Sequence, residues 1–227
     1  MDQEGRSPGL RERGKEARRL LLVRAAREAL EQDDFSMRRV AALAGLSEAT
    51  PYNLFESKSA LLGEVYREEC ERLLARLESA GGTNTLDRVF VAFVLIAADF
   101  DARPNFHRAL FTGLFESVTG RLRDAREDHG FTLWNGLLEA AIATGAIVDT
   151  VSARAVPRLF IYLIGGATRE WIAEIVSTDE WRIKVSHGLA LLLLPVASPD
   201  STRILRARLR TLEAEIGPVG AGASLGN

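Results

Sequence analysis

Apolar side chains recur three or four positions apart along most of the chain, which is the spacing of helices that bury one face. Beyond the first quarter, the pattern predicts helices over residues 59–79, 85–100, 104–112, 115–144, 157–176, 179–194 and 202–215. Gly, Pro and Asp residues mark the breaks between these segments. No segment alternates apolar and polar residues as a half-buried strand does. The expected fold class is therefore all-α.

Residues 36–58 predict two short helices joined by a tight turn. Ser36 can cap the first helix, and Gly45 stands where a helix end needs a positive φ without steric cost. Ser47 is expected to cap the second helix, and a third begins at Ser57-Lys58. This is the pattern of a helix-turn-helix, which lays its second helix in the DNA major groove. An ordinary corner between two capped helices has the same spacing, so spacing alone leaves both interpretations open.

The stretch from about residue 18 to residue 62 resembles the N-terminal domain of TetR-family transcriptional regulators. The matching positions are Leu22, Ala25, Ala26, Ala29 and Leu30, then Val40-Ala41-x-x-Ala44-Gly45-Leu46-Ser47, Thr50-x-Tyr52-x-x-Phe55 and Ser57-Lys58-x-x-Leu61-Leu62. The resemblance implies an N-terminal three-helix helix-turn-helix domain joined to a larger helical ligand-binding and dimerisation domain. It further implies a homodimeric regulator, most often a repressor, that leaves a palindromic operator in double-stranded DNA when a small, mostly hydrophobic effector binds. A DNA-binding regulator without an effector is the alternative.

Carried over residue by residue, the resemblance also implies a set of DNA contacts. These are Ser36, Arg38, Ser47, Ala49, Thr50, Tyr52, Asn53 and Lys58. Hydroxyl, amide and cationic groups suit phosphates and base edges, and Lys58 stands where a helix dipole assists phosphate binding. Glu48 is left open between a cytosine acceptor and a solvated acid. Pro51 departs from the family pattern, which usually has leucine or another side chain there, and so leaves open what the helix reads.

Charge is distributed unevenly along the 227 residues, whose net charge is −2. Eight basic residues between positions 6 and 27 face only Glu12 and Glu16, and they are Arg6, Arg11, Arg13, Lys15, Arg18, Arg19, Arg24 and Arg27. A local basic stripe can bind phosphate even when the whole protein is slightly acidic. The expected organisation is a flexible basic arm over 1–15, a helix-turn-helix domain over 16–62, an effector-binding and dimerisation domain over 63–200, a C-terminal helix over 201–216 and a disordered tail over 217–227.

The helices expected over 157–176 and 179–194 are apolar on nearly all sides, which favours a partner. In the TetR family the last two core helices build a four-helix dimer interface, so the resemblance suggests this role for Phe160, Leu163, Ile164, Ala167, Trp171, Val185, Leu189 and Leu193. A deep monomeric core is the alternative.

The resemblance also implies an effector pocket between the central helices. Candidate lining residues are Phe90, Phe93, Phe106, His107, Phe111, Phe115 and Trp134. Each of them also fits the simpler interpretation of a core aromatic. Sparse charge in this region favours a mostly hydrophobic ligand, and no cofactor or metal is expected.

Other function classes find little support. The three histidines, His107, His129 and His187, stand in separate predicted helices without metal spacing, and no nucleophile elbow, phosphate loop or dinucleotide fingerprint occurs. An enzyme is therefore not expected. A membrane-surface helix usually carries aromatic anchors on its apolar face, and the first expected helix has none. A single cysteine, Cys70, and an N-terminus without an apolar stretch fit a cytoplasmic protein.

Overall fold

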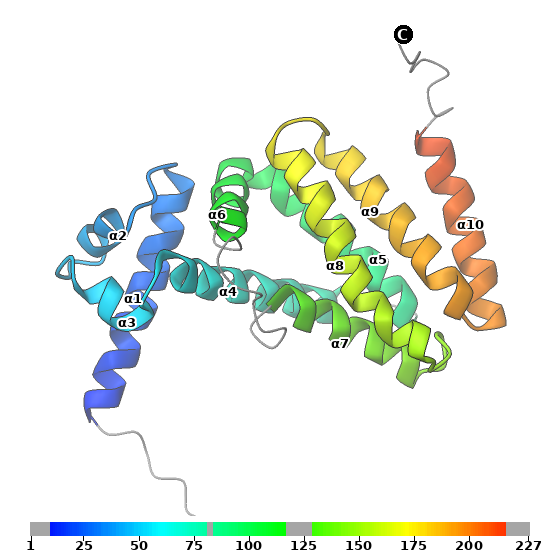
Figure 1. Cartoon of the computed structure of the whole chain (residues 1–227), viewed down its shortest axis with the longest axis horizontal. Coiled ribbons are helices and arrows are strands. Elements are labelled where there is room, and N and C mark those ends of the chain that lie inside the picture. Colours follow the sequence, from blue (N-terminus) through cyan, green and yellow to red (C-terminus); the bar gives the residue numbers. More distant parts are fainter. Residues whose placement is uncertain (1–9, 81–83, 117–128, 217–227) are drawn as a thin grey trace, which may run out of the picture. The chain divides into compact units, whose positions relative to one another are not determined.

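The computed structural model describes residues 10–80, 84–116 and 129–216. These residues form α1 (Leu10–Glu31), α2 (Met37–Leu43), α3 (Thr50–Phe55), α4 (Lys58–Ser79), α5 (Thr85–Ala102), α6 (Pro104–Glu116), α7 (His129–Ala143), α8 (Val151–Ile172), α9 (Thr178–Leu193), a 3-10 turn η2 (Leu194–Val196) and α10 (Pro199–Ile216) (Figure 1). Apart from one isolated bridge between Ile147 and Ala197, the described part contains no β-structure. The all-α prediction is confirmed.

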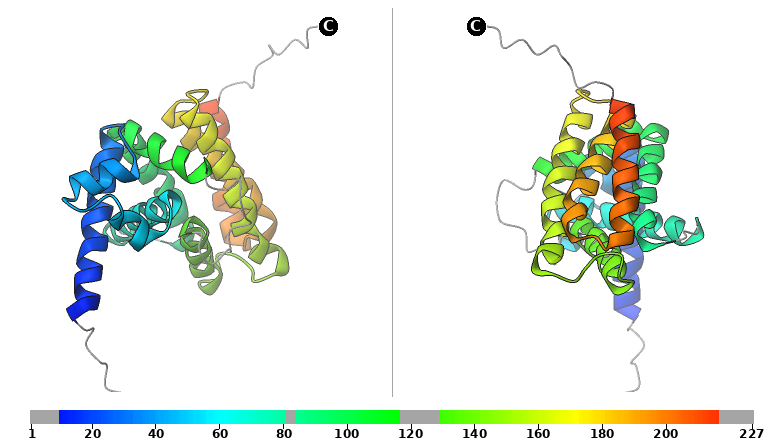
Figure 2. Two further views of the ribbon diagram at one scale, coloured as in Figure 1. Left: turned by 60° about the vertical axis from the view of Figure 1, so that its left-hand side comes forward. Right: turned by 90° about the vertical axis from the view of Figure 1, so that its right-hand side faces the viewer.

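The chain divides into two compact units. Unit 1 comprises residues 1–69 and 103–122, and unit 2 comprises residues 70–102 and 123–227. The helix α4 (cyan in Figure 2) begins in unit 1 and continues into unit 2, whereas α6 belongs to unit 1 although it follows α5 in the chain. Unit 1 is thus larger than the helix-turn-helix domain predicted over 16–62, because α6 completes its core.

The core of unit 1 is a seam between α1, α4 and α6. Leu22, Ala26 and Leu30 of α1 are fully buried, as are Leu61 of α4 and Leu110 of α6. Their four-residue spacing on α1 is the amphipathic pattern expected from the sequence. On α6, a Cβ at Gly113 would lie 2.5 Å from Leu62 Cδ1, so any larger residue there would force this buried leucine side chain to shift.

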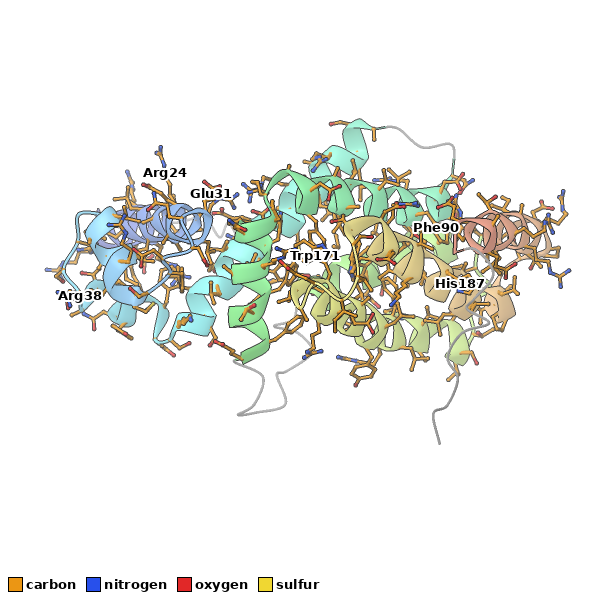
Figure 3. The ribbon with its side chains drawn as sticks, turned by 90° about the horizontal axis from the view of Figure 1, so that it is seen from above. Arg24, Glu31, Arg38, Phe90, Trp171 and His187 are labelled. Carbon is orange, nitrogen blue, oxygen red and sulfur yellow. The ribbon has the colours of Figure 1, made fainter. Side chains whose placement is uncertain are left out.

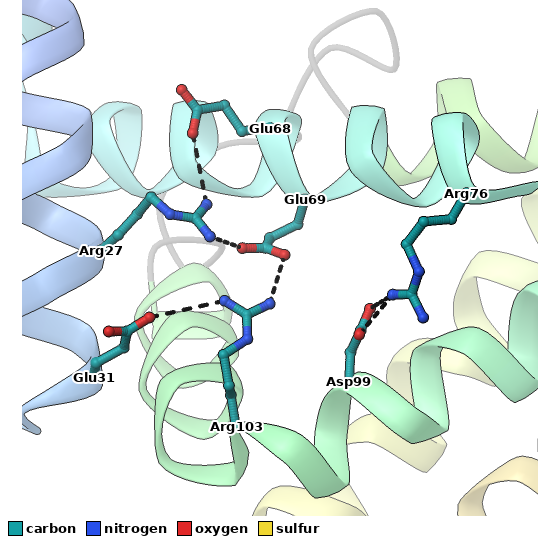
Figure 4. Close-up of polar contacts among 7 residues, drawn as sticks. All are labelled: Arg27, Glu31, Glu68, Glu69, Arg76, Asp99 and Arg103. Carbon is teal, nitrogen blue, oxygen red and sulfur yellow. Dashed lines mark hydrogen bonds and ion pairs between the residues drawn. The ribbon is translucent and has the colours of Figure 1, made fainter. Parts of the chain in front are cut away.

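A polar cluster at one edge of this seam joins the same three helices (Figure 4). Arg27 Nη2 of α1 lies 2.8 Å from Glu69 Oε1 of α4, and Arg103 Nη2, just before α6, lies 3.1 Å from Glu69 Oε2. Both guanidinium groups also lie over the ring of Phe106, at 5.3 Å and 4.6 Å from its centroid. One half-buried carboxylate and one aromatic ring therefore hold α1, α4 and α6 together.

Aromatic rings form the centre of unit 2. Phe93 of α5 lies 5.1 Å from Trp134 of α7 and 5.6 Å from Phe160 of α8, centroid to centroid. Further along α5, Phe100 stacks on Trp171 at 4.0 Å. Such pairs add to the free energy gained by burying their area.

Several boundaries differ from the prediction. Helix α1 begins at Leu10, so the last part of the expected arm over 1–15 is helical, while residues 1–9 and the expected tail over 217–227 lie outside the described residues. The helix expected over 115–144 is described only as the end of α6 and as α7, because residues 117–128 are not among those described.

Helix α8 starts at Val151 rather than at Pro157. Its N-cap is Thr150, whose side chain accepts a hydrogen bond from the backbone N–H of Ala153. Pro157 is buried inside the helix, where its nitrogen cannot donate an intrahelical hydrogen bond. In the described part of the chain, no helix is long and apolar enough to cross a membrane.

Candidate nucleic-acid interface

Helix α2 has the caps that the sequence predicted. Ser36 Oγ accepts a hydrogen bond from the N–H of Arg39 at 3.1 Å. After the last turn, Gly45 has φ of 65°, its N–H donates to the carbonyl of Ala42, and the N–H of Leu46 donates to the carbonyl of Ala41. This bonding pattern is the Schellman motif, which needs a left-handed residue at the position of Gly45. It turns the chain sharply from α2 toward α3.

Helix α3 begins at Thr50, and its N-cap is Ala49 without a side-chain cap. The prediction that Ser47 caps this helix is therefore wrong. Ser47 Oγ instead shares a hydrogen bond with Thr50 Oγ1 at 2.8 Å, and the carbonyl of Ser47 accepts from the N–H of Thr50. Residues 48–49 form a turn in place of the first helical turn.

The two faces of α3 are clearly different. Pro51 and Phe55, one turn apart, are buried, whereas Tyr52 is 55% exposed and Asn53 is exposed. Pro51 occupies the first turn, where its missing N–H has no helical partner to lose. Proline therefore shapes the start of α3 from the inside and does not belong to the exposed face that holds Tyr52.

Arg19 of α1 fixes the other end of α3. Its Nη1 donates to the carbonyl of Leu54 at 2.7 Å, its Nη2 donates to Glu64 Oε1 at 3.2 Å, and its guanidinium lies 4.3 Å above the ring of Phe55. Arg67 also donates to Glu64. A six-residue helix leaves most of its last carbonyls unpaired, so this arginine satisfies one of them from a neighbouring helix. The sequence did not reveal this role, because Arg19 was one of many arginines in a basic stripe.

Cations and carboxylates alternate over the α2–α3 surface. Arg38, labelled in Figure 3 and extending away from the ribbon, is 82% exposed, and its Nε lies 3.1 Å from Glu48 Oε1. Arg39 bonds to Gln32 and pairs with Asp34. The ammonium group of Lys58, at the start of α4, lies 5.5 Å from the ring centroid of Phe35 and 4.0 Å from Glu116 Oε2.

Most of the predicted DNA contacts are accessible within unit 1. Seven are exposed and Thr50 is half-buried; the exposed ones are Ser36, Arg38, Ser47, Ala49, Tyr52, Asn53 and Lys58. The basic stripe divides into two groups. Arg19 and Arg27 are used in internal contacts, whereas the cations over 11–18 are exposed along the first turns of α1.

The seven predicted effector-pocket residues are distributed over both units. Phe90, Phe93 and Trp134 are buried in the aromatic centre of unit 2. Phe106 and His107 are buried in unit 1, and Phe111 and Phe115 follow on the same helix, α6, half-buried. Phe111 lies edge-on to Tyr66 at 5.7 Å, so its ring packs within unit 1.

Six of the eight predicted dimer residues are buried within unit 2 of the single chain. The buried side chains are Phe160, Ala167, Trp171, Val185, Leu189 and Leu193, whereas Leu163 and Ile164 are half-buried. A helix that is apolar on all sides does not show in its sequence which side its own unit covers, and the dimer interface stays a prediction. The large apolar side chains left exposed on α8 are instead Val151, Leu159 and Tyr162, together with Leu191 on α9.

Within the ranges that the structure describes, no group of three or more His, Cys, Asp or Glu residues is arranged to hold a metal ion.

Comparison with known proteins gives a consistent fold. No model of a known protein family matches the sequence, and no significant match is found among curated proteins. Among solved structures, a TetR transcriptional regulator from Rhodococcus sp. RHA1 matches with TM-score 0.62 and 20% identity over 80% of this chain and 98% of that one. The R. erythropolis repressor QsdR, of the TetR family, matches with TM-score 0.60 and 18% identity over 81% and 97%.

A third similar structure is Thermus thermophilus FadR, a TetR-family repressor in complex with lauroyl-CoA, with TM-score 0.57 and 20% identity over 80% of this chain and 97% of that one. The chain therefore has the fold of TetR-family transcriptional regulators. The likeness extends over nearly the full length of these structures.

Replacing Arg19 by methionine should loosen α3 while leaving its sequence intact. The change removes two charge-assisted hydrogen bonds and a cation–π contact at a side chain that is 28% exposed, a loss of about 2 kcal/mol. Hydrogen exchange of the α3 amides, followed by mass spectrometry, should accelerate roughly 30-fold. Arg24→Met is the matched control, because Arg24 is exposed on the same helix. Equal exchange in both variants would contradict the assigned role.

Proposed function

We propose that this protein is a DNA-binding transcriptional regulator of the TetR family, which acts as a cytoplasmic homodimer and performs no catalysis. The observation that carries the proposal is the α2–α3 unit, in which Arg38, Tyr52 and Asn53 are exposed while Pro51 and Phe55 anchor the helix. The TetR-family fold supports the same conclusion. Repression is the direction we propose, since QsdR and Thermus FadR are both described as repressors.

The exposed face of α3 suits binding in the major groove of DNA, with one groove for each subunit. The exposed face of α3 presents a phenol and an amide, which bind phosphates and base edges. Lys58 at the N-terminus of α4 adds a cation where the helix dipole already favours phosphate. One such unit buries little surface, so two copies on a palindrome are needed for tight specific binding.

Duplex binding tests the proposal directly. The wild-type protein should select an inverted repeat from randomised duplexes, with an affinity that falls steeply as salt rises. The double variant Arg38→Ala/Tyr52→Ala should lose about 100-fold of this affinity, because it removes two side chains of the proposed DNA-binding surface. The variant should still fold, because both side chains are exposed and contribute little to folding. The control variant Arg203→Ala/Val94→Ala removes an exposed arginine and an exposed apolar side chain from unit 2 and should bind like the wild type. Equal loss in both double variants would count against this surface.

We propose that the dimer forms through the exposed stripe of α8. Leu159 and Tyr162 lie one turn apart and are 50% and 69% exposed, and the exposed Gly166 continues the same face. Apolar side chains in such a row favour association over solvation. The proposal keeps the first of the two helices that the sequence indicated, and it uses the exposed residues of that helix in place of the buried ones.

The variant Leu159→Glu/Tyr162→Glu should therefore be monomeric. Two carboxylates from each subunit would have to be buried unpaired at the interface, so the dimer dissociation constant should rise by at least about 100-fold, or roughly 2.7 kcal/mol. Sedimentation velocity over a range of concentrations measures this change. Val94→Glu, at an exposed apolar position of α5, is the control and should leave the dimer intact. A dimer that survives in the double variant would place the interface elsewhere.

We propose further that unit 2 binds a small, mostly hydrophobic effector near Phe90, Phe93 and Trp134. The support is the apolar, aromatic centre of this unit, together with the acyl-CoA complexes of Thermus thermophilus FadR and Bacillus subtilis FadR. Such an effector releases DNA only if it binds the non-DNA conformation more tightly. A 100-fold loss of operator affinity needs about 2.7 kcal/mol of coupling.

Lauroyl-CoA is the first effector to test, with free CoA as its control. At a free concentration of about 100 times its dissociation constant, it should raise Tm by roughly 5–10 °C and weaken binding to the selected duplex. Free CoA should do neither, because it lacks the apolar chain. Equal responses to both compounds, or none, would exclude an acyl chain as the recognised group and favour a regulator of another effector class or of none.

A further inference from the structure

Glu48 is a carboxylate on a surface that is expected to meet phosphates. It lies in the turn between α2 and α3, two residues before Thr50, and is 69% exposed. A lone acid there would be repelled by DNA and would weaken binding. Its Oε1, however, lies 3.1 Å from Nε of Arg38, so the acid is paired with the most exposed cation of the α2–α3 surface.

The atom that makes the contact matters. The closest approach of Glu48 is to Nε of the guanidinium rather than to a terminal nitrogen, so the edge formed by Nη1 and Nη2 can still donate to a second acceptor. This pair spans N7 and O6 of guanine in the major groove, the commonest base-specific contact of arginine. A flexible arginine held at Nε loses less rotamer entropy on binding than an unrestrained one.

We propose that Glu48 is a specificity-determining positioning residue, which holds Arg38 so that its two Nη groups read a guanine in each half-site. The inference rests on the proposed DNA-binding function. It gives the surface a defined base preference, a G·C pair, at the position that Arg38 reaches. Glu48 also disfavours loose phosphate contacts of Arg38, because its own charge opposes any phosphate brought near the pair.

The ion pair between Glu48 and Arg38 contributes little to the stability of the fold. Ion pairs between exposed side chains contribute little to folding, and the turn is already held by the hydrogen bonds of Ser47 with Thr50. Neutralising Glu48 should therefore leave the protein folded and dimeric. A change in base preference can then be assigned to the position of Arg38.

The experiment compares binding logos selected from randomised duplexes by the full-length wild type, Glu48→Gln, Glu48→Asp, Arg38→Gln and Glu48→Gln/Arg38→Gln. Glu139→Gln, an exposed acid on α7 that accepts from Asn135, is the control for charge alone. At one G·C position, the preference should fall at least about 10-fold in Arg38→Gln and about 5-fold in Glu48→Gln. The double variant should lose no more than Arg38→Gln, and Glu48→Asp should retain part of the preference. Non-specific affinity should rise a few-fold in Glu48→Gln, because an acid has gone from the DNA face.

Three outcomes overturn the inference. An unchanged logo in Glu48→Gln, with only a uniform gain in affinity, would mean that Glu48 merely sets the charge of the surface. Loss of a C preference that Arg38→Gln keeps would mean that Glu48 itself accepts from cytosine. No duplex binding by the wild type would refute the proposed function as well, so the failures of the two proposals are distinguishable.

Discussion

The burial of one face of α1 is the constraint on which the α2–α3 surface, proposed here to bind DNA, depends. Helices of seven and six residues, such as α2 and α3, are too short to be stable in water on their own. They are stable here because they pack against the buried apolar face of α1, which is formed by Leu22, Ala26 and Leu30. Arg19, on the same helix, also donates a hydrogen bond to the last turn of α3. The exposed side chains of α3 are therefore positioned by residues that lie beneath them and on the neighbouring helix.

The same helix is joined to α6 by the polar cluster around Glu69. This carboxylate receives Arg27 and Arg103 at once, and both arginines cover Phe106. Because α6 directly follows α5 of unit 2 in the chain, any change in the direction of α6 has to strain or break contacts in unit 1. A few charge-assisted contacts around one carboxylate thus order α1, α4 and α6 relative to one another.

Apolar content alone does not distinguish a core residue from an interface residue. Phe160, Trp171 and Leu189 have the composition of an interface, yet they are buried within unit 2 of the single chain. Leu159 and Tyr162, on which the proposed interface rests, stand out in the structure by their exposure. The same holds for charge. The sequence shows an acid at Glu48, but only the structure shows that this acid is paired with Arg38.

The sequence by itself determined the all-α class, the helix-turn-helix, the cap at Ser36 and the left-handed turn at Gly45, because these depend on contacts between residues only a few positions apart. It also indicated the exposed positions of Tyr52 and Asn53. Only the tertiary structure decided that α6 belongs to unit 1 together with α2 and α3, that Pro51 faces inward, and that Arg19 bonds to α3 over a separation of 35 residues. Those features depend on which faces of distant helices meet, and helical periodicity shows that a face is buried without showing what buries it.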